Sequence, residues 1–83
     1  MAQIRVRITV RFFGPAAERA GCSERVVNLA DATVRGVAAL LGNDHPGLVT
    51  ASTRFAVGTE YADSATPLKE GDVVSVIPPV GGG

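Results

Sequence analysis

Strict alternation of apolar and polar residues near the N-terminus constrains the fold of this chain more than any other sequence feature. Between residues 4 and 12 every even position is apolar, whereas every odd position is arginine or threonine. Successive side chains of a β-strand point to opposite faces, so this period of two predicts a strand with one buried face. We therefore expect the chain to build a sheet around this strand.

Phe13 departs from the alternation, because its large aromatic side chain falls in phase with the arginines. If the strand continues, Phe13 lies on the face that should meet solvent. If the strand ends at Phe12, Phe13 turns back into the core instead. The sequence leaves both interpretations open.

A short helical turn and a second strand are expected next. Pro15 at the first helical position and Gly21 after the last one are typical of such a turn. Residues 23–29 then predict a strand whose Val27 and Leu29 point inward. Antiparallel pairing of this strand with the first one makes a hairpin.

One main helix follows the hairpin. Thr33 is a good N-cap residue, and Gly42-Asn43 indicates the helix end. The apolar positions after Thr33 fall at i, i+3, i+4 and i+7, which is one helix stripe: Val34, Val37, Ala38 and Leu41. Gly36 costs roughly 1 kcal/mol relative to alanine, so we expect packing on the sheet to hold the helix.

Three further strands are predicted in the second half of the chain. Alternation resumes in residues 54–57, and Gly58-Thr59 turns the chain into a shorter strand at residues 60–62. The last candidate, residues 73–77, is so rich in valine that we expect it to be buried on both faces. Burial on both faces is typical of a central strand.

This order of elements predicts an α+β protein. In a small sheet covered by one helix, it places the last strand beside the first as a parallel central pair joined through a helical crossover. The arrangement is the β-grasp, or ubiquitin-like, fold: a mixed sheet of about five strands with one main helix packed on one face. We expect residues 1–77 to form this domain and residues 78–83 to form an extended C-terminal tail.

Composition excludes several classes of function. Eight basic and eight acidic residues give no net charge, so the electrostatic footprint for nucleic-acid or membrane-surface binding is missing. We find no apolar run of membrane-spanning length and no signal peptide, which predicts a cytoplasmic protein. A single cysteine cannot form an internal disulfide, and no metal-ligand spacing is present, so we expect no bound metal.

The chain offers no convincing active site. Cys22 has no histidine nearby in sequence to activate it, and His45 precedes a proline in a loop, as a surface histidine would. Four carboxylates lie in predicted turns without inferable pairing: Glu60, Asp63, Glu70 and Asp72. The arginines of the first strand suit either a solvated face or one side of a protein interface.

The C-terminal residues remain as the candidate functional element. Pro78-Pro79 prevents further ladder pairing and holds the chain extended as it leaves the sheet. The six residues after Ile77 can reach about 20 Å from the domain at roughly 3.3 Å each. Three terminal glycines have no Cβ, so they could enter a narrow channel and present an α-carboxylate, which must be activated before it can donate its acyl group.

Several motifs together resemble the family of molybdopterin synthase small subunits, among the MoaD/ThiS sulfur carriers. They are RFFGPAAERAG, ATV at the helix start, AVGTEYA, PLKEGDVVSVIPPV and the final Gly-Gly. The resemblance covers the chain from about Val10 to Gly83. Two positions depart from it: Gly81 replaces the usual serine or alanine, and Gly58 replaces an asparagine.

The resemblance implies a non-catalytic sulfur carrier that binds no cofactor itself. A ubiquitin-activating-type adenylyltransferase would use ATP to adenylate Gly83, and a sulfurtransferase would supply the sulfur of a thiocarboxylate. The large subunit of molybdopterin synthase, in a heterotetramer, would accept this sulfur for dithiolene formation. Gly82 and Gly83 would be the functional pair; contacts with the partner would come from the remaining matched positions, Phe13, Tyr61, Ile77, Pro78, Pro79, Val80 and Gly81.

Other functions share the same fold and tail. A sulfur carrier for thiamine or cysteine synthesis is one alternative, and a ubiquitin-like protein modifier that forms an isopeptide bond is another. A plain interaction module with an incidental glycine tail is a third. The first activation step is common to the sulfur carriers and the modifier, so the sequence alone does not separate them.

Overall fold

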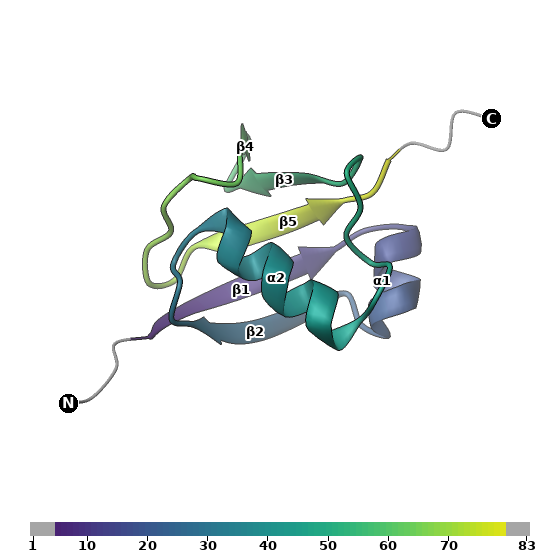
Figure 1. Cartoon of the computed structure of the whole chain (residues 1–83), viewed down its shortest axis with the longest axis horizontal. Helices are drawn as coiled ribbons and strands as arrows, with labels where there is room; N and C mark the ends of the chain where they lie inside the picture. Colours follow the sequence, from purple (N-terminus) through teal and green to yellow (C-terminus); the bar gives the residue numbers. More distant parts are fainter. Residues whose placement is uncertain (1–4, 80–83) are drawn as a thin grey trace.

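The computed structural model describes residues 5–79 of the chain (Figure 1). It contains two helices and five strands, and they follow the order predicted from the sequence. The elements are β1 (Val6–Phe12), α1 (Pro15–Ala20), β2 (Glu24–Leu29), α2 (Val34–Asp44), β3 (Arg54–Val57), β4 (Glu60–Ala62) and β5 (Val73–Ile77). Among the described residues, neither helix has the length and apolar character needed to cross a membrane.

All five strands form one mixed sheet in the order β2-β1-β5-β3-β4. β1 and β5 are parallel at its centre, and every other neighbouring pair is antiparallel. The parallel pair is joined through α2, which lies across one face of the sheet (Figure 1). This topology confirms the predicted β-grasp fold with its central pair of first and last strands.

The core lies between the sheet and α2. Alternate residues of β1 and β5 are completely buried on this side: Ile8, Val10, Val74 and Val76. Val34, Val37 and Leu41 meet them from α2, as the predicted stripe requires, whereas Ala38 is only partly buried. The even residues of β1, which the alternation predicted to be buried, thus lie on the face that α2 covers.

The prediction for β5 is wrong in one respect. Val73, Ser75 and Ile77 are half-buried, because helical cover exists on only one face of the sheet. A run of valines reflects β-propensity and a central position, and it does not require a second covering layer. β5 is central, as expected, but it is fully buried on one face only.

The ends of α2 depend on local contacts that are only partly visible in the sequence. Thr33 is the N-cap, and its Oγ1 accepts a hydrogen bond of 3.2 Å from the backbone N–H of Gly36. The helix extends to Asp44, slightly beyond the predicted end. A Cβ atom on Gly36 would collide with the carbonyl oxygen of Asp31, so this glycine has a packing reason that helix propensity did not indicate.

Candidate functional site

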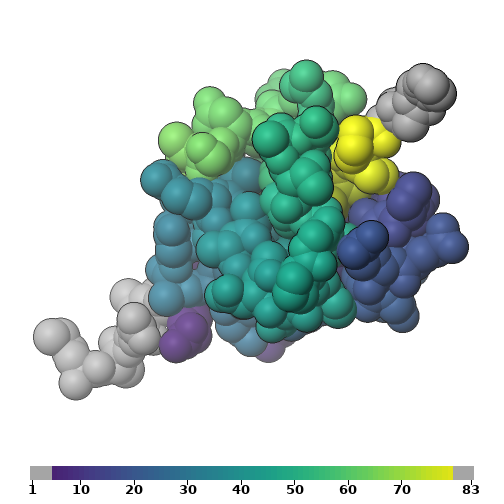
Figure 2. Space-filling view, turned by 45° about the vertical axis from the view of Figure 1, so that its right-hand side comes forward, coloured from purple at the N-terminus to yellow at the C-terminus, as the bar shows by residue number. Residues whose placement is uncertain are grey.

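The parallel central pair places Phe13 beside the start of the C-terminal tail. Parallel strands end at the same edge of a sheet, and the pair Phe12 and Val76 lies at that edge. Phe13 and Ile77 are each one residue further along: Phe13 has left β1, whereas Ile77 is the last residue of β5 and still pairs with Arg54 of β3. Figure 2 shows the yellow end of the described chain, up to Pro79, next to the blue α1 and the teal segment that follows α2.

Phe13 faces solvent although β1 ends at Phe12. Its side chain is 49% exposed, so the alternative in which it turns back into the core is wrong. The reason is the next residue: Gly14 has φ 54° and ψ −132°, a conformation that favours glycine. The carbonyl oxygens of Phe13 and Gly14 accept hydrogen bonds of 3.1 and 3.0 Å from the first turn of α1, which fixes the path of this turn.

Gly14 also approaches the base of the tail. A Cβ at this position would meet Cγ of Pro78 at 4.0 Å, which is ordinary van der Waals contact. Pro78 is half-buried here, and Pro79 is exposed. The start of the tail therefore lies near the turn that follows Phe13.

The sheet face opposite α2, which we call the open face, carries the other predicted contact residues. Tyr61 lies on β4, opposite Ala56 of β3, and Ala56 lies opposite Ser75 of β5. Its side chain is 71% exposed. Strands are about 4.8 Å apart, so Tyr61 lies about 10 Å to one side of β5, whereas Phe13 lies beyond its other side. The two aromatic residues thus flank the strand that leads into the tail.

Arginine side chains surround this partly apolar surface. Nε of Arg11 lies 3.3 Å from a carboxylate oxygen of Glu24. Arg54 lies opposite Ile77 in the β3–β5 register, and no described carboxylate forms an ion pair with it. Arg54 is not among the predicted site residues, although alternation in residues 54–57 places it on the face opposite to the buried Phe55.

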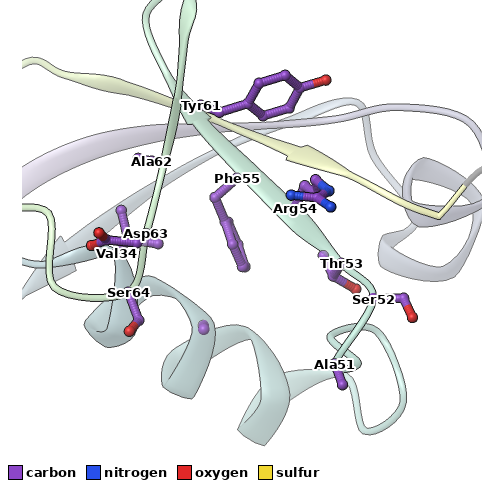
Figure 3. A pocket seen from close by; sticks show the side chains of 11 residues that line it. Val34, Ala51, Ser52, Thr53, Arg54, Phe55, Tyr61, Ala62, Asp63 and Ser64 are labelled. Carbon is purple, nitrogen blue, oxygen red and sulfur yellow. The ribbon is translucent and has the colours of Figure 1, made fainter.

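The described residues also line hollows away from the open face. A groove of about 380 Å³ lies on the helix side, between α2, the segment before β3 and the segment after β4 (Figure 3). The Phe55 ring points into this side toward α2, and the Tyr61 ring points to the opposite side of the sheet (Figure 3). A smaller hollow of about 180 Å³ borders the tail base, with Arg19, Leu48 and Pro78 among its lining residues.

The side chains that the sequence did not support as catalytic are exposed, lie at a helix end or bond to nearby backbone groups. Cys22 is exposed, and His45 is the C-cap of α2. The carboxylates of Asp63, Glu70 and Asp72 accept hydrogen bonds from backbone N–H groups of Ala65, Arg7 and Lys69. Within residues 5–79 no three His, Cys, Asp or Glu side chains gather as metal ligands would.

The remaining predicted site residues, Val80, Gly81, Gly82 and Gly83, lie outside the described residues. The structure thus describes the platform of the predicted site: Phe13, Tyr61, Ile77, Pro78 and Pro79. Of these, Phe13 and Ile77 each follow the last residues that β1 and β5 pair with each other, Phe12 and Val76, and Tyr61 lies apart from them on the edge strand.

A β-grasp domain whose last, central strand leads into a tail beside an open sheet face is the architecture of ubiquitin-like carrier proteins. Residues 10–83 match the model of the ThiS family. The chain belongs to this family and is a sulfur carrier, as the sequence motifs indicated.

Individual relatives agree with this assignment. The chain is 35% identical to the molybdopterin synthase sulfur carrier subunit of Chlamydomonas reinhardtii, over 94% of this chain and 100% of that protein. A structure of the complex of subunits 1 and 2 of molybdopterin-converting factor from Helicobacter pylori contains a chain that is 32% identical, with a TM-score of 0.69, over 94% of this chain and 100% of that one. SAMP1 of Haloferax volcanii is 26% identical, with a TM-score of 0.79, over 93% of this chain and 99% of that one.

Proposed function

We propose that this chain is the sulfur-carrier subunit of a molybdopterin synthase. The observation that carries the proposal is the 35% sequence identity with the Chlamydomonas protein of that name, over the full length of that protein. The Helicobacter structure supports it, because there a similar chain is in complex with subunit 2 of the same factor. The partner of this chain would then be the large subunit, in a heterotetramer.

In this proposal Gly83 is the terminal residue and carries the sulfur. A carboxylate is a poor electrophile, so an adenylyltransferase of the ubiquitin-activating type first joins it to the AMP part of ATP and releases pyrophosphate. A persulfide of a sulfurtransferase then displaces AMP to give an acyl disulfide, and a thiol cleaves this disulfide, so that the chain keeps the thiocarboxylate and the two thiol sulfurs leave as a disulfide. These steps occur on partner proteins, and the chain itself needs no cofactor.

The described residues would supply recognition. Phe13 and Ile77 form an apolar surface where the chain leaves the sheet, and Tyr61 extends contact across the open face. Pro78 and Pro79 have no backbone N–H, so they direct the chain away from the ladder. Docking of the open face on the large subunit would thereby aim Val80, Gly81, Gly82 and Gly83 into its active site.

Intact mass of the purified chain tests the chemistry. After incubation with ATP, the activating enzyme and a sulfur donor, we expect a mass gain equal to the difference between sulfur and oxygen. Deletion of Gly82 and Gly83 together leaves a single terminal glycine and should abolish this gain, whereas Gly81→Ala, which leaves the last two residues intact, should retain it. A mass gain that persists after this double deletion would contradict the assignment of the Gly-Gly pair.

Capture of the partner tests the pathway. Tagged chain from its own cells should copurify with a molybdopterin synthase large subunit, and a partner from thiamine or cysteine synthesis would refute the assignment to molybdopterin.

A protein modifier is the second candidate, favoured by the likeness to SAMP1, the small archaeal modifier protein 1. Its chemistry shares the adenylation step and ends in an isopeptide bond between Gly83 and a lysine. Denaturing purification distinguishes the two functions, because only a modifier leaves covalent conjugates that survive denaturant. Finding only the free chain and its thiocarboxylate would exclude the modifier.

A further inference from the structure

The two borders of the sheet differ in length and cover. β4, at one border, has three residues, whereas β2, at the other, has six. Figure 1 shows no described strand beyond β2. Short edge strands resist pairing with other chains, and long ones offer a template for it. β2 is therefore the border with the greater capacity to add a strand.

The hydrogen-bond phase of β2 can be assigned from its neighbour. Thr9 donates its backbone N–H to Asp72, on the β5 side, and Phe12 donates its N–H to Ser23, on the β2 side, at 2.9 Å. Even residues of β1 thus bond to odd residues of β2, since bonded pairs alternate in an antiparallel ladder. Glu24, Val26 and Asn28 consequently direct their N–H and C=O groups outward.

Charges on β2 give this border little protection. Edge strands are commonly guarded by charged side chains, but both charged residues of β2 are paired within the molecule. Glu24 pairs with Arg11 of β1, and Arg25 pairs with Asp44 at the end of α2. Between the outward groups lies Val26, whose apolar side chain is 55% exposed.

We propose that β2 pairs with β2 of a second copy of this chain, antiparallel and centred on Val26. In this register each Val26 lies opposite its counterpart, and Glu24 of one copy lies opposite Asn28 of the other. The outward groups of all three residues then find partners, which gives about six backbone hydrogen bonds. The sheets join edge to edge, with both copies of α2 on the same side.

The side chains favour this register over its neighbours. The Asn28 amide can donate to the Glu24 carboxylate of the other copy, so the pairing is self-complementary. If the pairing were centred on Arg25 instead, two Arg25 side chains would lie opposite each other, which is unfavourable. If it were centred on Val27, Glu24 would lie opposite Ala30, which is beyond the end of the strand.

Such an interface is small, so the association should be weak. A single pair of edge strands falls below the roughly 1,200 Å² of a standard stable interface, and we expect a dissociation constant of about 0.1–1 mM. The proposal concerns the free chain and does not depend on which sulfur pathway the chain serves.

Sedimentation equilibrium tests the association. The chain should be monomeric at about 10 μM and largely dimeric above about 1 mM. Val26→Pro removes one outward N–H, and edge strands tolerate proline there, so it should weaken the dimer at least about tenfold. Val26→Thr, which retains the N–H, should dimerise like the unaltered chain. A monomer throughout this range, or equal association of the proline variant, would refute the proposal.

Disulfide trapping tests the register and does not rely on the proline variant. In a Cys22→Ser background, Val26→Cys should form a disulfide dimer under mild oxidation, because opposed residues of a bonded pair lie about 5.5 Å apart between Cα atoms. Asn28→Cys is the matched control: its counterpart would lie four residues along the strand, more than about 13 Å away. Equal trapping of the two variants would overturn the proposed register.

Discussion

The two faces of the sheet have opposite relations to solvent, although the same strands form them. On the helix side, Ile8 and Val10 of β1 and Val74 and Val76 of β5 are completely buried. On the open face, the alternate residues of these strands are half-buried or exposed, and aromatic residues flank β5. Packing on the helix side thus stabilises the fold, while the open face retains apolar surface that the fold itself does not need.

This difference separates stability from recognition within a very small domain. The hydrophobic effect scales with area removed from water, so side chains on the helix side should dominate the free energy of unfolding. Side chains on the open face should affect partner affinity more than folding. Four comparisons test this division.

Two isoleucines include the largest single effect that we expect. Ile8→Ala creates a cavity under α2 and should lower the free energy of unfolding by about 3 kcal/mol. Ile77→Ala, on the half-buried open face, should cost about 1 kcal/mol. Urea unfolding followed by circular dichroism measures both. Equal costs would show that the open face contributes as much to folding as the helix side does.

Two glycines of α2 test how closely the helix layer is packed. Gly36→Ala should destabilise the chain by about 1–3 kcal/mol, because the new methyl group must displace the carbonyl of Asp31. Gly42→Ala is the matched control, since a Cβ there meets nothing within 4 Å and helix propensity improves. It should stabilise by up to about 1 kcal/mol. Thermal unfolding of both variants decides whether the two effects have opposite signs.

Tyr61 tests the open face directly. Its side chain is 71% exposed, so Tyr61→Ala should change the free energy of unfolding by less than about 0.5 kcal/mol. If the open face docks on the large subunit, the same change should weaken binding about tenfold, as loss of an aromatic contact does. Tyr61→Phe retains the ring and should bind nearly normally. Calorimetric titration with the partner would contradict this role if Tyr61→Ala bound with unchanged affinity.

Local rules were sufficient to predict most of the elements. Alternation places Val10 inward, the N-cap preference selects Thr33, and the glycine at position 58 marks the turn between β3 and β4, where its φ is 62°. The parallel central pair followed from rules on chain connection and needed no knowledge of side-chain contacts. For Phe13 the alternation left an outward and an inward position open, and only the resemblance favoured the outward one.

Contacts between distant segments were not predictable from the sequence. The direction of Phe13 depends on the backbone of Gly14, which is set where α1 meets the tail base. Position 36 needs glycine because the carbonyl of Asp31, in the preceding loop, leaves no room for a Cβ atom. Helix propensity indicated only that glycine there destabilises the helix. Arg54 beside Ile77 requires the β3–β5 register, which no local pattern contains.

The two ion pairs, one from each side of the sheet, give the smallest contrast. Arg11 and Glu24 lie on the open face with more than half of each side chain exposed, whereas Arg25 and Asp44 are less exposed and join β2 to α2. Asp44 also lies at the C-terminal end of the helix, where a negative charge is unfavourable, so its single substitution would mix two effects.

Double-mutant cycles isolate the pair energies from such effects. With Arg→Met and carboxylate→amide changes, measured at about 10 μM where the chain should be monomeric, we expect about 0.2–0.5 kcal/mol for Arg11 and Glu24. The less exposed pair should give about 0.5–1 kcal/mol, and it should retain more of this energy in 1 M salt because screening is weaker away from solvent. An equal or reversed order would show that proximity to α2 adds nothing to charge pairing, which would limit the distinction between the two faces to apolar packing.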